Sequence, residues 1–239
     1  MSQQLGKIER LEAEHFRRGK KLYLVPLVYS GDEAPDEYRE KHSRYWQQAA
    51  EQLSNLASQI GDVKRVYHEL IYQSGKDGIE AVERINPGSH QIARTQCGGG
   101  AAFEPLEEKE LLEEVMDWQR CLMIGFVSHK VERKVFDLYL EASRKRDQSI
   151  ANKIQETLGE DEAGLLFIRE GHSVQFPSDV EVFSVVPPAL DEIHRWYRDR
   201  STPGPEKKEK PASEEDAGEA RDEATPARKT TTRKSRKKS

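Results

Sequence analysis

A strand–helix–strand pattern between residues 22 and 72 constrains the fold more than any other part of the sequence. Residues 22–29 (LYLVPLVY) form a nearly continuous apolar run, which is typical of a strand buried on both faces. From Pro35 to Ile60, apolar residues recur at spacings of three and four and predict one long amphipathic helix. Residues 63–72 (VKRVYHELIY) are rich in β-branched and aromatic residues and predict a second strand. This order of elements predicts a right-handed βαβ unit with parallel strands.

The second half of the chain continues the alternation of helices and strands. Apolar residues at helical spacing run through 107–158, although the run at 121–127 (CLMIGFV) fits either a helix or a strand. Residues 164–168 and 180–186 are short apolar runs that predict two more buried strands. We therefore predict an α/β fold with a mainly parallel sheet of four or five strands flanked by long helices. Pro26 removes one donor from the first strand, which favours an edge position or a bulge.

Composition divides the chain into three parts. We predict an N-terminal helical arm (1–19), an α/β domain (20–200) and a disordered tail (201–239). The tail has no Leu, Ile, Val, Phe, Trp or Tyr, so it lacks the apolar surface that a core requires. Residues 228–238 hold seven positive charges and no negative ones. This basic end is predicted either to contact RNA or another polyanion, with steep salt dependence, or to serve as a solubilising tail.

The totals exclude several classes of protein. Two cysteines, Cys97 and Cys121, are too few for a disulfide framework, and neither lies in a CxxC motif. The first residues lack the apolar core of a signal peptide, and no segment approaches about 18 consecutive apolar residues. We expect a soluble cytoplasmic protein with no membrane partner. The α/β domain is acidic overall, which argues against a broad nucleic-acid-binding face.

The strongest candidate site follows the predicted strand at 164–168. In open α/β sheets, ligands bind outside the carboxyl ends of the strands, and Arg169, Glu170 and His172 follow this strand directly. Glu170 and His172 are candidates for an acid/base pair or for two metal ligands. Arg169 is a candidate ligand-binding residue. Arg146 and Asp147, at the head of the preceding helical segment, are expected to face the same edge, and Arg146 is a further candidate ligand-binding residue. The alternative is an ordinary turn, because charged residues are common where a strand ends.

A second candidate site lies in residues 86–104, which we predict to be a long irregular loop. Such a loop in a compact domain is usually functional or disordered. Gly98, Gly99 and Gly100 allow backbone amides to approach a ligand phosphate, with Arg94 assisting, but the segment lacks any known phosphate-binding motif. The alternative is a mobile connector. We predict no metal site, because His90 and Cys97 in this loop fall short of a zinc signature.

Two family resemblances involve the C-terminal part of the chain. The motif RDQSIA, with His172 26 residues after Arg146, is similar to the C-terminal motif pair of TraB/ChaN/EreA-like proteins. That superfamily includes hydrolases and ligand-binding proteins whose strand usually ends in Gly-x-x-His, and Arg169 stands here where that glycine would be. The segment 150–168 (IANKIQETLGEDEAGLLFI) resembles the third domain of the archaeal–eukaryotic release factor and Pelota family. The chain has no Gly-Gly-Gln tripeptide, so this second resemblance implies association with translation rather than peptidyl-tRNA hydrolysis.

The sequence favours a binding module over an enzyme, and it leaves both hypotheses open. The first hypothesis is a non-catalytic module that binds a small anionic ligand or RNA at the exit of the 164–168 strand and at the glycine loop. The competing hypothesis is a metal-dependent hydrolase resembling the TraB/ChaN group, centred on Glu170 and His172. No cofactor is indicated by any motif. A third hypothesis makes the long helices at 107–158 the interface of a homo-oligomer.

Overall fold

The computed structural model describes residues 18–201, so the predicted N-terminal helix and the tail lie outside the described residues. Within this range, each strand is followed by one or two helices, except that the fourth strand is followed directly by the fifth. No helix in residues 18–201 combines the length and the apolar character that a membrane crossing requires. The elements are β1 (Lys20–Pro26), α1 (Asp36–Ile60), β2 (Val63–His68), α2 (Gly75–Ile85), α3 (Pro87–Gly98), β3 (Ala102–Phe103), α4 (Lys109–Met123), α5 (His129–Thr157), β4 (Ala163–Ile168), β5 (Val180–Ser184) and α6 (Pro188–Ser201).

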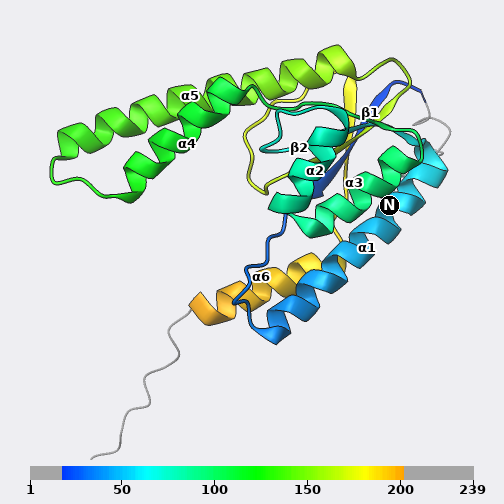
Figure 1. The fold of residues 1–239 in the computed structure, drawn as a ribbon, viewed down its shortest axis with the longest axis horizontal. Helices are drawn as coiled ribbons and strands as arrows, with labels where there is room; N and C mark the ends of the chain where they lie inside the picture. Colours follow the sequence, from blue (N-terminus) through cyan, green and yellow to red (C-terminus); the bar gives the residue numbers. More distant parts are fainter. Residues whose placement is uncertain (1–17, 202–239) are drawn as a thin grey trace, which may run out of the picture. The chain divides into compact units, whose positions relative to one another are not determined.

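The sheet has five strands, all parallel, in the order β3-β2-β4-β1-β5 (Figure 1). This arrangement confirms the predicted α/β fold with a parallel sheet and long helices. The prediction of an edge position or a bulge for Pro26 is wrong, because β1 lies between β4 and β5. Pro26 is the last residue of β1 and pairs only with β4, since the pairing with β5 ends at Leu24. Its missing donor therefore costs the sheet little.

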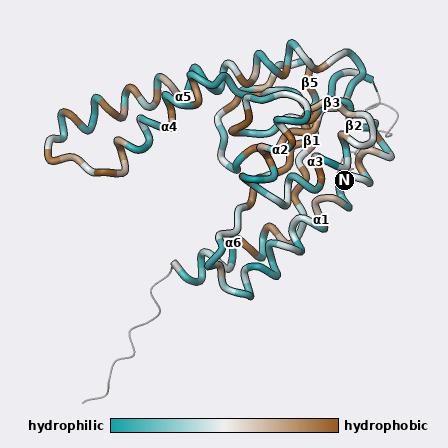
Figure 2. Tube along the Cα trace, in the orientation of Figure 1, coloured by the Kyte–Doolittle hydropathy of each residue, from teal (hydrophilic) through white to brown (hydrophobic). Residues whose placement is uncertain are grey.

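Helices cover both faces of the sheet and create two hydrophobic layers. The chain moves one way along the sheet through β2 and β3 and returns through β4, so right-handed crossovers place α5 opposite α1, α2 and α3. Successive residues of each central strand face opposite layers. Tyr23 and Phe167 pack beneath α1, whereas Leu22 and Leu166 pack beneath α5. Figure 2 shows the hydrophobic residues concentrated on the strands and the hydrophilic ones on the outer helix surfaces.

Residues 87–98 form helix α3, so the prediction of one long irregular loop at 86–104 is wrong. Asn86 is the N-cap and its side chain accepts a hydrogen bond from the backbone N–H of Ser89, while Pro87 occupies the first helical turn. A side chain on Gly88 would place its Cβ 2.3 Å from the ring of Trp46 on α1. The absence of a side chain there lets α3 approach α1 closely.

Helices α4 and α5 form an antiparallel hairpin that extends beyond the sheet (Figure 1). The run at 121–127 is the end of α4 and the turn that follows it, not a strand. Only the second half of α5 packs on the sheet, through Ile150, Ala151 and Ile154. The outer part of the hairpin is therefore supported mainly by the contact between its own two helices.

Candidate functional site

Charged side chains gather at the carboxyl edge of the sheet, where the neighbouring strands β2 and β4 end. Because the strands are parallel, the residues that follow them emerge at the same edge. Glu69 follows β2 and Arg169 follows β4, while Glu107 lies on the segment between β3 and α4. Arg146 reaches the same place from α5. These four side chains form one connected network of ion pairs.

Arg146 is the centre of this network and is almost completely buried. Its Nε donates to Oε2 of Glu107 at 2.9 Å, and its Nη2 donates to Oε1 of Glu69 at 3.0 Å and also to Oε1 of Glu107. The exposed fraction of the side chain is 3% for Arg146, 3% for Glu69 and 0% for Glu107. Buried charges are stable only when they are paired and hydrogen-bonded, so each of these groups depends on the others.

The turn after Glu69 carries backbone strain. Leu70 has a φ of 71°, a conformation that a leucine rarely adopts. Its backbone N–H donates to Oε1 of Glu107 at 3.1 Å, so the buried carboxylate holds the strained residue in place. Strained backbone of this kind persists where the surrounding contacts over-determine it, and it is concentrated at functional sites.

Glu69 also holds Arg169 in a fixed position at the protein surface. The backbone N–H of Arg169 donates to Oε2 of Glu69 at 2.7 Å, and its Nη1 donates to Oε1 at 2.8 Å. Among the described residues, Nη1 is the one side-chain nitrogen of Arg169 that makes a hydrogen bond, and 46% of the side chain is exposed. Tyr29, from the segment after β1, belongs to the same edge and is 43% exposed. Burial of its hydroxyl, followed by the charge of Glu69, raises the pKa of Tyr29 to about 12.

His172 and Asp147 complete the arrangement. Nδ1 of His172 is buried and has no hydrogen-bond partner among the described residues, and the ring packs edge-on against Phe176. Burial lowers the pKa of His172, with Arg169 acting in the same direction and Glu69 and Asp147 opposing. Burial likewise raises the pKa of Asp147. A neutral imidazole and a partly buried carboxyl group therefore lie close to one exposed guanidinium at physiological pH.

The structure brings together three of the residues predicted from the strand exit, and it separates the fourth. Arg146, Arg169 and His172 share this edge. Glu170 does not face His172, because its Oε2 lies 2.7 Å from Nε2 of His194 on α6, and both of those side chains are 47% exposed. The predicted acid/base pair of Glu170 and His172 is therefore not formed.

The glycine segment lies elsewhere in the fold. Gly98 ends α3, and Gly99 and Gly100 form the turn that enters β3, so they precede a strand and lie at the opposite edge of the sheet from Arg169. Arg94 and Gly98 line a groove of about 650 Å³ between α2, α3 and β3. The two sites predicted from the sequence do not converge.

The described residues contain no group of three His, Cys, Asp or Glu side chains placed to hold a metal ion. His90 and Cys97 line the same groove as Arg94. Burial raises the pKa of the Cys97 thiol, which makes it less reactive as a nucleophile at neutral pH.

A second polar cluster is buried between α3 and β2. Nε2 of His68 lies 2.9 Å from Oγ of Ser89, a contact that resembles the base and nucleophile of a hydrolase. Both residues are 0% exposed, so no substrate reaches them. Asn86 joins the cluster through the backbone N–H of Ser89 and donates to the carbonyl of Val28 at 2.9 Å. This cluster ties three segments of the core together and is structural.

Two residues of the buried network, Glu69 and Glu107, were not predicted from the sequence. Glu69 lies inside the run 63–72, which we predicted to be one strand, whereas β2 ends at His68. The available signal was that Glu69 is the single carboxylate in this run. Glu107 lies among many exposed charges of the same kind, and no feature of the sequence distinguishes it. Asp147 was predicted, with Arg146, to face this edge of the sheet, and its charge acts on His172 there. Comparisons of the chain with family models, curated proteins and solved structures find no match.

Proposed function

We propose that the protein binds a small anionic molecule, a carboxylate or a phosphate, at the carboxyl edge of the sheet. Arg169 is the main contact and His172 is the second. The observation that carries the proposal is a half-exposed guanidinium held by a buried carboxylate beside a buried ring nitrogen with no partner. The network of Glu69, Glu107 and Arg146 positions Arg169 and does not touch the ligand.

Arg169 is preorganised for this task. A guanidinium has five N–H donors and binds carboxylates and phosphates through two parallel hydrogen bonds. The contacts of Arg169 with Glu69 fix its direction while the other side-chain nitrogens keep their donors. Less conformational entropy is lost on binding when the group is already held in place.

His172 supports the same location. Buried polar atoms nearly always have a hydrogen-bond partner, so an unpaired Nδ1 requires an explanation. Nδ1 itself is covered but the residue is partly exposed, so a turn of the ring lets a ligand oxygen accept a hydrogen bond from Nδ1–H and supply the missing partner. Since burial lowers the pKa of His172, the ring is neutral at pH 7 and gains a charge as the pH falls below the ordinary value of about 6.5. Binding of an anion should therefore strengthen below that pH.

The substitution Arg169→Gln tests the proposal. Calorimetric titration of the full chain with inorganic phosphate, malonate and a mononucleotide should show binding of at least one of them. Arg169→Gln should weaken that binding by about tenfold or more, because a hydrogen bond to a charged group contributes about 1.5–3 kcal/mol. The matched control is Arg44→Gln, since Arg44 has a similarly exposed side chain and also pairs with one carboxylate, that of Glu192.

Two outcomes would overturn the proposal. One is that none of the three anions binds to the wild-type protein. The other is that Arg169→Gln and Arg44→Gln weaken binding equally, which would place the anion elsewhere.

A single-stranded RNA oligonucleotide belongs in the same titration. RNA binding that depends on Arg169 supports the RNA version of the proposal, and RNA binding independent of Arg169 assigns that activity to another surface.

A hydrolase is the second candidate, and the position of Asp147 favours a revised form of it. Asp147, rather than Glu170, interacts electrostatically with His172, and burial shifts the pKa values of these two groups toward each other. Such pairs are typical of sites that transfer protons. On a panel of ester and phosphate substrates, Asp147→Asn and His172→Ala should each abolish activity, and Glu170→Gln should retain it. Activity that is lost only with Glu170→Gln would contradict this assignment.

A further inference from the structure

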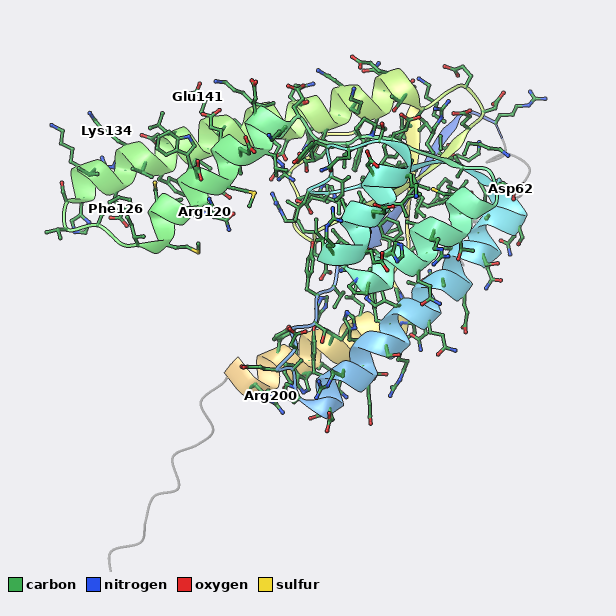
Figure 3. The ribbon with its side chains drawn as sticks, in the orientation of Figure 1. Asp62, Arg120, Phe126, Lys134, Glu141 and Arg200 are labelled. Carbon is green, nitrogen blue, oxygen red and sulfur yellow. The ribbon has the colours of Figure 1, made fainter. Side chains whose placement is uncertain are left out.

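The turn between α4 and α5 is an exposed apolar surface. Residues 123–127 (MIGFV) join the two helices, and 73% of Met123 and 79% of Ile124 are exposed, while Val127 is fully exposed. Phe126 is partly exposed and lies at the outer end of the hairpin (Figure 3). Single exposed apolar residues are ordinary, but four large ones within five consecutive positions form a patch that indicates an interaction site.

Basic side chains surround this patch, which we call the hairpin tip (residues 120–134). The tip contains Arg120, Lys130, Arg133 and Lys134 against one acidic residue, Glu132, which gives a formal charge of +3. Figure 3 shows Arg120 and Lys134 near the outer end of the hairpin, with Phe126. The tip therefore combines aliphatic side chains with positive charge, in a chain whose formal net charge is −5.

The adjoining part of α4 carries the opposite charge. Residues 108–117 hold five acidic side chains and one basic one, Lys109, which gives a formal charge of −4. Asp117, the last residue of this acidic base of the hairpin, pairs with Arg120 at the start of the tip, with 2.9 Å between Oδ1 and Nη1, so the acidic and basic stretches adjoin along α4. A negatively charged surface should therefore attract the tip and repel the base, which orients the hairpin with its tip toward that surface.

We propose that the hairpin tip docks on the surface of an anionic lipid bilayer. Interfacial segments insert apolar side chains between lipid headgroups while lysines and arginines contact anionic headgroups, and the tip offers both in one short segment. This is binding at the surface, which needs no membrane-spanning helix, and it revises the sequence-based expectation of no membrane partner. A second copy of the chain fits the tip less well, because two tips of like charge repel each other. RNA also fits less well, because Met123, Ile124 and Val127 offer bases no aromatic face to stack on, and Phe126, the one aromatic ring of the patch, is only partly exposed.

Flotation with lipid vesicles tests this proposal on the full chain. The wild-type protein should float with vesicles of phosphatidylcholine mixed with phosphatidylserine, and much less with phosphatidylcholine alone. The double variant Ile124→Asp/Val127→Asp should lose this flotation. Lys130→Glu/Lys134→Glu changes the formal charge of the tip by four and should reduce binding by about tenfold or more. Both pairs of side chains are exposed, so the substitutions leave the core intact.

The control is Val186→Asp, which places one negative charge, against two in the double variant, on a half-exposed valine outside the hairpin and should leave flotation unchanged. The proposal is overturned if the wild-type protein does not float with the vesicles. It is equally overturned if the double aspartate variant floats as well as the wild type, because lipid binding would then belong to the basic tail alone. Light scattering that shows a dimer of the wild-type protein and a monomer of the double aspartate variant would also overturn it. So would a double aspartate variant that loses RNA binding but keeps flotation. These results do not depend on Arg169, so they separate this surface from the anion site.

Discussion

Replacing Arg146 with methionine should destabilise the protein by about 3–5 kcal/mol, the range expected when one partner of a buried ion pair is removed. Arg146 neutralises Glu69 and Glu107 together, and both carboxylates are almost fully buried. Methionine keeps much of the side-chain volume but supplies no donor, so Glu107 loses its ion-pair partner and Glu69 keeps only Arg169. The free energy of unfolding, measured by urea denaturation at neutral pH, checks this expectation.

Arg144→Met is the control for that measurement. Arg144 lies on the same helix, two residues earlier, and is exposed, so its loss should change the free energy of unfolding by no more than about 0.5 kcal/mol. The triple variant Arg146→Met/Glu69→Gln/Glu107→Gln should recover part of the lost stability, because it removes the unpaired charges as well. If Arg146→Met is as stable as Arg144→Met, the carboxylates have found other partners and the network is not a unit.

The network explains how the candidate site is linked to the core. Glu69 accepts hydrogen bonds from Arg146 on one side and from Arg169 on the other. Glu107 binds Arg146 and also holds the strained Leu70. A buried ion network is weak evidence for stability, because well-packed apolar residues often serve as well. Its value here is geometric, since it fixes the direction of the exposed guanidinium at the edge where a ligand is expected.

The sheet was predictable because its strands are short apolar runs that stand out from a highly charged chain. The residues of β1 and β4 alternate between two buried layers, so both faces had to be apolar, and the sequence shows this directly. The order of the strands was not predictable. It depends on which strands pair, and β4 inserts between β1 and β2, which are consecutive along the chain.

Helix α3 was missed because its sequence is polar and contains glycine at both ends. The informative signal was Asn86-Pro87, an N-cap residue followed by a proline in the first turn. That pair predicts a helix start, but no strong apolar repeat follows it. The error had a functional consequence, because a long loop with three glycines indicated a phosphate site, whereas a helix and a tight turn occupy most of that segment.

Half of the candidate site was predictable from the rule that ligands bind at the carboxyl ends of parallel strands. That rule pointed to Arg169 and His172. Their buried partners Glu69 and Glu107 could not be found in the same way, because they come from two distant segments. Only the fold brings these segments together, and a sequence of which a third is charged offers too many alternatives.

Acid should destabilise the protein, and His68 should account for a large share of the effect. His68 is 0% exposed, and burial lowers its pKa to about 4. The unfolded chain binds this proton near pH 6.5 and the folded protein only near pH 4, so the unfolded state holds more protons between those values. The stability that neutral His68 contributes is fully present above about pH 6.5. Below that pH it falls by about 1.4 kcal/mol per pH unit, so the loss at pH 4 is roughly 3 kcal/mol. Burial lowers the pKa values of His42 and His172 too, so their contributions have the same sign.

The variant His68→Gln isolates this contribution. Nδ1 of His68 donates to the carbonyl of Glu69 at 2.6 Å, a hydrogen bond that glutamine does not reproduce, so the variant should be less stable than the wild type by about 1–2 kcal/mol at pH 7.5. Glutamine does not titrate, so the difference should shrink as the pH falls and change sign near pH 5. Urea denaturation at several pH values measures both curves. His129→Gln serves as the control, because 96% of that side chain is exposed and its curve should follow that of the wild type. Curves for His68→Gln and the wild type that stay parallel from pH 7.5 to 4.5 would show that burial of His68 does not drive the loss of stability in acid.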